Sequence, residues 1–271
     1  MDALADKFLK MGARAVVEAI SPRDQRLRFR VPPTLAVDIR SDRHGEFFHV
    51  RRPADVKVDV IDLRPRERHL LLMARNEGRA VVGPQKSKFL CGHDERHWFV
   101  AAVPEKTRGV SNVQQAMDAL KPQAVWNAIA RHGVMAQRNL RRTAAFVRQG
   151  EWFFLPRPDL VFQANRVLKN EPLRRGAGKP HWCDQLVRDG GEMVRVCAAY
   201  PNGLTESEYR ALDEQTRKRH RWTAMARDAR PFVRGRVRHP DHETIVLDVW
   251  HEVVMNTETQ AFAMRNVAFL D

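Results

Sequence analysis

The stretch from Pro231 to Trp250 reads PFVRGRVRHPDHETIVLDVW and predicts a β-hairpin. Between Phe232 and Arg238, valine alternates with arginine, which is typical of a strand with one buried and one exposed face. The turn falls at His239-Pro240-Asp241-His242, because proline and aspartate favour turns, and Thr244–Trp250 forms the returning strand. The hairpin indicates an antiparallel sheet.

Three further hairpins are expected upstream of this stretch. They pair Leu35–Ile39 with Phe47–Val50, Val56–Leu63 with His69–Met73, and Phe89–Cys91 with Trp98–Val103. Isolated strands are expected at 27–31, 152–155 and 193–198. The consecutive aromatic residues 152–154 should leave at least one ring facing outward, because neighbouring side chains on a strand point to opposite faces.

Helical periodicity predicts helices over 2–20, 112–120, 123–132, 137–147, 182–188 and 206–218. The last begins with a capping box, in which Thr205 is the N-cap and Glu208 the third helical residue. Together these elements predict an α+β fold with antiparallel sheets and segregated helices. Whether the chain forms one domain or two subdomains is left open. A boundary near residue 110 would separate a helix and sheet at 1–110 from a mixed helical and hairpin region at 111–271, and the alternative is a single domain.

The composition indicates a soluble globular protein with a strong basic excess. Of 271 residues, 43% are hydrophobic and 30% charged, and the formal net charge is +14. No apolar run is long enough for a transmembrane helix, and the acidic N-terminus lacks the features of an export signal. The 3 cysteines are widely spaced, so we expect no disulfide framework, no thiolate-rich zinc site, and a cytoplasmic location.

A basic surplus of this size favours nucleic acid as the partner, since arginine binds phosphate oxygens in pairs and releases counterions. RNA or single-stranded DNA is preferred slightly over duplex DNA. The surplus lies within residues 1–200, because residues 201–271 carry as many acids as bases. The candidate contacts are Arg141, Arg142, Arg174, Arg175, Lys179, Arg217, Lys218, Arg219, Arg221, Trp222, Arg234, Arg236 and Arg238.

Two clusters could instead hold a divalent metal, although no cofactor is predicted outright. One is Cys91-Gly92-His93-Asp94-Glu95-Arg96-His97, and the other is His239-Pro240-Asp241-His242. Only tertiary folding could join them to each other or to His181 and Cys183. His251 lies a strand length from the second turn and should not take part. The candidate catalytic residues are His93, Asp94, His97, His239, Asp241 and His242.

The sequence leaves open whether the protein is an enzyme. The main expectation is a basic nucleic-acid-binding protein. The first alternative is a metal-dependent nuclease or other phosphodiester hydrolase that uses the histidine and aspartate clusters. The second is a structural or assembly subunit of a nucleoprotein complex, which would have protein partners.

Overall fold

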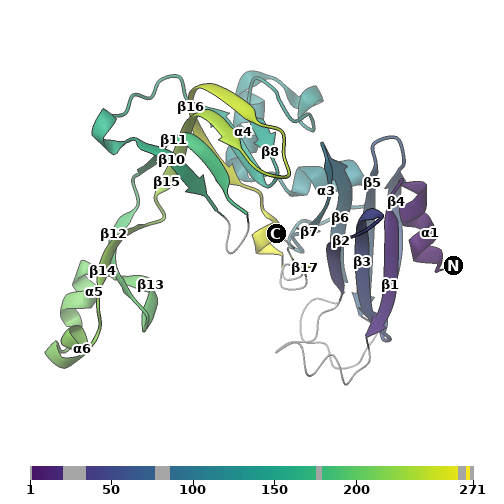
Figure 1. The fold of residues 1–271 in the computed structure, drawn as a ribbon, viewed down its shortest axis with the longest axis horizontal. Coiled ribbons are helices and arrows are strands. Elements are labelled where there is room, and N and C mark those ends of the chain that lie inside the picture. The colour runs from purple at the N-terminus through teal and green to yellow at the C-terminus, as the bar shows by residue number, and fades with distance from the viewer. Residues whose placement is uncertain (1, 21–34, 77–85, 175–178, 262–266, 269–271) are drawn as a thin grey trace.

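The computed structural model describes residues 2–20, 35–76, 86–174, 179–261 and 267–268. These residues form four sheets with short helices between them (Figure 1). Most strand pairs are antiparallel, as the α+β prediction requires. The strand expected at 27–31, together with Arg175, lies outside the described residues.

The first two sheets and helix α1 (Ala3–Lys10) form the N-terminal part and share one hydrophobic core, which includes Phe8, Phe48 and Phe89. The first sheet has the order β1-β3-β2-β17, and the second is a β4-β5-β6-β7 meander. Their strands are β1 (Arg14–Ile20), β2 (Ala36–Asp42), β3 (Gly45–Pro53), β4 (Val56–Arg64), β5 (His69–Asn76), β6 (Lys86–Asp94), β7 (His97–Val103) and β17 (Val267–Ala268). The three predicted hairpins are therefore confirmed.

The N-terminal helix is shorter than predicted. It ends at Lys10, and Gly12 follows with a left-handed φ of +84°. The next residues form β1, which pairs in parallel with β3, and β17 pairs in parallel with β2. The first sheet is thus mixed rather than antiparallel. The apolar residues of β1 fit a helix period loosely, but sheet pairing determines their structure.

The largest sheet has the order β10-β11-β15-β16-β9-β8 and contains the predicted hairpin as β15 (Arg230–Arg238) and β16 (Ile245–Met255). Its other strands are β8 (Val147–Gln149), β9 (Trp152–Pro156), β10 (Leu168–Leu173) and β11 (His181–Asp189). Helix α3 (Val113–Ala119) packs on β5 and β6, and helix α4 (Gln123–His132) on β9. Short 3-10 turns lie at Met135–Gln137, Ala164–Arg166 and Glu258–Gln260.

Three predictions in this region are wrong. Residues 137–147 form a 3-10 turn and loop rather than a helix, and 182–188 form β11. The side chains of Trp152, Phe153 and Phe154 are all buried, with 7%, 4% and 0% of their surface exposed. Apolar clusters cover both faces of the sheet, so no ring of β9 faces solvent.

Residues 192–227 form a small arm that projects away from the other sheets (Figure 1). It contains the three-stranded sheet β13-β12-β14 and two helices. Its elements are β12 (Glu192–Cys197), β13 (Tyr200–Thr205), α5 (Glu206–Ala211), α6 (Glu214–Arg219) and β14 (Thr223–Arg227). The capping box at Thr205 is confirmed, but the predicted helix is split, because Asp213 caps a second helix. None of the helices in the described part of the chain has the length and apolar character of a membrane span.

Candidate metal centre

Three histidines meet at one end of the largest sheet. His181 is the first residue of β11, whereas His239 and His242 lie in the connection between β15 and β16. The ladder that pairs Trp182 with Arg238 brings the start of β11 beside this connection. As a result, the rings of His181 and His239 stack with centroids 4.2 Å apart, and one ligand nitrogen from each of the three lies within 4.8 Å of the others.

His181 is buried without a hydrogen-bond partner among the described residues. Only 2% of the surface of His181 is exposed to solvent. Both its ring nitrogens are buried, and neither has a hydrogen-bond partner in the described part of the chain. A buried polar group without a partner costs about 1–3 kcal/mol, so such groups in folded proteins usually have one. Burial lowers the pKa of His181 to about 2 and that of His242 to about 4. Both rings are therefore neutral near pH 7, which is the form that binds metal.

The turn between β8 and β9 passes close to these rings. Gly150 has φ +57°, and a β-carbon at this position would lie 2.8 Å from Nε2 of His242 and 3.6 Å from Nε2 of His181. The two Nε2 atoms therefore face the same small space beside the glycine. Any larger residue would fill that space.

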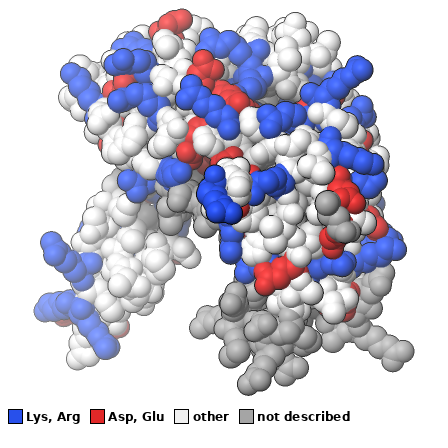
Figure 2. All heavy atoms as spheres, turned by 45° about the vertical axis from the view of Figure 1, so that its right-hand side comes forward, with Lys and Arg blue, Asp and Glu red and all other residues white. Residues whose placement is uncertain are grey.

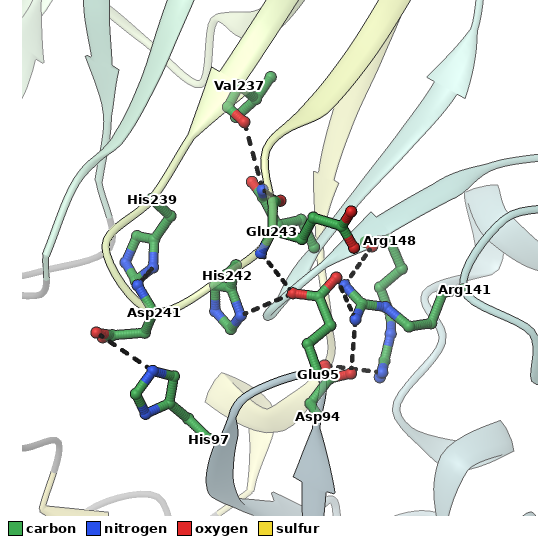
Figure 3. A network of polar contacts seen from close by, with 11 residues as sticks. Asp94, Glu95, His97, Arg141, Arg148, Val237, His239, Asp241, His242 and Glu243 are labelled. Carbon is green, nitrogen blue, oxygen red and sulfur yellow. Dashed lines mark hydrogen bonds and ion pairs between the residues drawn. The ribbon is translucent and has the colours of Figure 1, made fainter.

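The carboxylate of Glu95 lies close to the ring of His242 (Figure 3). Oε2 of Glu95 is 3.9 Å from Nδ1 of His242 and accepts the backbone N–H of Glu243 at 2.6 Å. Arg141 forms ion pairs with both Glu95 and Asp94. At 3.9 Å the contact between Glu95 and His242 is not a hydrogen bond, and Nδ1 of His242 is buried without a hydrogen-bond partner among the described residues.

A fourth histidine approaches from the N-terminal sheets. His97 begins β7, and its Nε2 is 4.0 Å from Oδ1 of Asp241, which Lys179 also contacts at 2.9 Å. The β6–β7 turn thus meets the β15–β16 connection (Figure 3). Both clusters singled out in the sequence converge here, together with His181.

The site lines a cavity of about 800 Å³ between the N-terminal sheets and the largest sheet. Five of the six candidate catalytic residues line it, namely Asp94, His97, His239, Asp241 and His242. His93 is the exception, because its ring packs edge-on against Trp98 with centroids 4.8 Å apart. As expected, His251 lies outside the cluster, and its Nδ1 contacts the carbonyl oxygen of Val249.

The sequence named His181 only as a residue that tertiary folding could add to the clusters, and it did not identify Gly150 or Glu46. The one available signal was that His181 follows a glycine-containing basic loop. Cys183, the other residue considered with it, contacts the backbone of His181 through Sγ, and burial raises its pKa to about 12. It therefore serves as a core residue rather than a thiolate ligand.

The predicted nucleic-acid contacts are not gathered on one surface. Arg141 and Lys179 are paired with acids beside the three-histidine cluster, and Asp184 pairs with Arg236 and Arg238. Arg234 lies over the Trp250 ring. Figure 2 shows acidic side chains interspersed with the basic ones over the main body.

The remaining candidates lie mainly on the arm. Its far end carries Arg217, Lys218, Arg219, Arg221 and Trp222. Trp222 is not free to stack on a base, because it packs on Tyr200 and Tyr209 and donates its N–H to the carbonyl of Arg217. Lys218 pairs with Glu214, and Arg217 lies over the Tyr209 ring. No ion pair in the described part of the chain involves Arg217, Arg219 or Arg221.

The donor set suits a first-row transition metal. Imidazole nitrogens bind Zn²⁺ at about 2.0–2.1 Å, which places tetrahedral ligand atoms about 3.3 Å apart. The ligand atoms lie within 4.8 Å of one another, and the three rings are stacked, so metal binding would require the rings to turn toward a common point. Three protein ligands leave one position open for water or substrate, as in catalytic rather than structural zinc sites.

Comparison with known proteins adds no functional assignment. No family model matches the chain, and neither curated proteins nor solved structures gave a match.

Proposed function

We propose that this protein is a metal-dependent phosphodiester hydrolase that acts on nucleic acid. The observation that carries the proposal is the buried His181, unpaired within the described part of the chain, beside His239 and His242. A metal held by these imidazoles would keep a position open for water or substrate, and there it would lower the pKa of bound water and polarise a phosphoryl oxygen. His181, His239 and His242 would hold it.

The net charge of +14 supports a phosphodiester as the substrate. A polyanion is drawn to a basic protein by counterion release, and this attraction does not depend on sequence. The cavity volume of about 800 Å³ fits a nucleotide unit, since ligand pockets are about 300–1,000 Å³. A recessed site of this size favours a single strand, RNA or DNA, over a duplex, because a paired base is held within the stack.

The proposal is tested by cleavage of a labelled single-stranded RNA and DNA with Zn²⁺, Mn²⁺ or Mg²⁺ added to chelator-treated protein. We expect cleavage to disappear with chelator and return with metal. His181→Ala should remain inactive under the same conditions, whereas His251→Ala removes a buried histidine of the same sheet and should retain activity. Cleavage that survives chelation, or that His181→Ala retains, would overturn the proposal.

Nucleic-acid binding without catalysis is the second candidate. It is favoured by the end of the arm, where Arg217, Arg219 and Arg221 follow one another within five residues without an ion pair in the described part of the chain. In this case binding would weaken steeply with salt, and chelation of metal would not affect it.

A further inference from the structure

His97 lies across the cavity from the three-histidine cluster and is held by a different part of the fold. It belongs to β7, whereas His181, His239 and His242 belong to the largest sheet. Its side chain is 36% exposed and lines the cavity. His97 is not a member of the cluster of convergent ligand atoms.

Glu46 fixes the orientation of the His97 ring. Its Oε1 accepts a hydrogen bond from Nδ1 of His97 at 2.7 Å, and its Oε2 accepts the backbone N–H of Trp98 at 3.0 Å. Both carboxylate oxygens are therefore engaged, so the carboxylate cannot turn away from the ring. Nδ1 is the nitrogen that donates to this carboxylate, because a carboxylate oxygen accepts hydrogen bonds.

The consequence is that Nε2 is the nitrogen of His97 that is left to exchange a proton in the cavity. In the neutral ring only one nitrogen is protonated, and that nitrogen is Nδ1. Nε2 points toward Asp241, which lies in the chain between His239 and His242. The Asp241 carboxylate favours a proton on Nε2, so His97 can hold a proton there and release it beside the residues that flank His239 and His242.

We propose that His97 is the proton-transfer residue of this site and that Glu46 is its positioning residue. The inference rests on the proposed hydrolase function. As the oxygen of water forms a bond to phosphorus, Nε2 of His97 takes one water proton. The bond from phosphorus to the leaving oxygen then breaks with its electron pair, and His97 returns the proton to that oxygen. The products are a phosphomonoester and an alcohol.

The alternative role for His97 is that of a fourth metal ligand, and metal content distinguishes the two. His97→Ala should bind metal with wild-type stoichiometry, whereas His181→Ala should lose it. The kcat of His97→Ala should fall about 10²–10⁴-fold, as is usual on removal of a general acid–base group. Free imidazole added to the assay should restore part of the activity of His97→Ala, an effect that a purely structural defect would not show.

Two further variants complete the experiment. Glu46→Gln should keep the metal and lose roughly 10- to 100-fold in kcat, as variants of residues that orient an imidazole do. His93→Ala removes a neighbouring histidine that does not line the cavity and should leave kcat unchanged. Full activity in His97→Ala, or loss of its metal, would overturn this inference alone. A wild-type protein that neither binds metal nor cleaves would overturn the proposed function as well.

Discussion

The β-carbon that Gly150 lacks would lie 2.8 Å from Nε2 of His242. Real β-carbons essentially never come this close to a backbone or side-chain atom. Glycine is therefore favoured at this turn by its φ of +57°, and a larger residue would have to displace the imidazole of His242.

Gly150→Ala should displace His242 and weaken Zn²⁺ binding at least about tenfold, by analogy with other changes beside a ligand. Gly133→Ala is the matched control, because Gly133 has φ +65° and its new β-carbon would meet nothing within 4 Å in the described part of the chain. Each substitution costs about 1–2 kcal/mol of backbone strain. Zinc titration by calorimetry should show weaker binding only in Gly150→Ala. Equal affinities in the two variants would contradict the geometry.

The stability of the metal-free protein should fall as the pH falls below about 6.5. Burial lowers the pKa of His181 to about 2 and that of His242 to about 4, so the unfolded chain binds protons that the folded chain does not. Between pH 6.5 and 4, each group should reduce the free energy of unfolding by roughly 1.4 kcal/mol per pH unit. Urea unfolding at several pH values measures this slope. His181→Asn should make it shallower, and an unchanged slope would contradict the burial of a neutral ring.

The arginines at the end of the arm should contribute to nucleic-acid affinity. The test is the triple variant Arg217→Ala, Arg219→Ala, Arg221→Ala with a single-stranded nucleic acid. The slope of log affinity against log salt concentration should become shallower by about 2, because each phosphate contact contributes about 0.7 to that slope. Fluorescence anisotropy over a range of KCl concentrations measures it. Arg236→Ala is the control, since Arg236 is already paired with Asp184. A triple variant with the affinity and salt slope of the wild type would show that these arginines do not contact nucleic acid.

Phe153→Ala should destabilise the fold by about 3–5 kcal/mol, as expected for a fully buried aromatic ring. Phe153 is 4% exposed, and its ring packs against Phe146 with centroids 5.3 Å apart. Leu140→Ala, at a position 56% exposed, should change the free energy of unfolding by less than about 0.5 kcal/mol. Chemical denaturation of both variants gives the comparison. A small effect of Phe153→Ala would mean that its face of β9 is open to solvent.

Hairpins were the part of the fold that could be predicted from sequence, because alternation and turn residues are local signals. Both signals, alternation and turn residues, are present in the hairpin around His239-Pro240-Asp241-His242 and in the hairpins of the second sheet. β11 could not be recognised in this way. It lies inside a sheet that is covered on both faces, so its residues do not alternate, and their pattern predicts a helix instead.

The candidate site was predicted in pieces. Both turns with histidine and aspartate were identified, but their meeting depends on contacts between residues about 145 positions apart, such as Glu95 with His242. His181 joins them only through the β11–β15 ladder. The predicted basic surface is not found as one patch. A net charge does not reveal which arginines are already paired with acids, as Arg236 is with Asp184.

Metal content is the most direct test of the account. The protein, treated with chelator, supplied with Zn²⁺ and freed of excess ion, should retain one zinc per chain by elemental analysis. X-ray absorption should show imidazole nitrogens at about 2.0–2.1 Å. His181→Ala and His242→Ala should lose the zinc, and His251→Ala should keep it. A wild-type chain that retains no zinc, or variants of His181 and His242 that bind it as tightly as wild type, would contradict the metal centre.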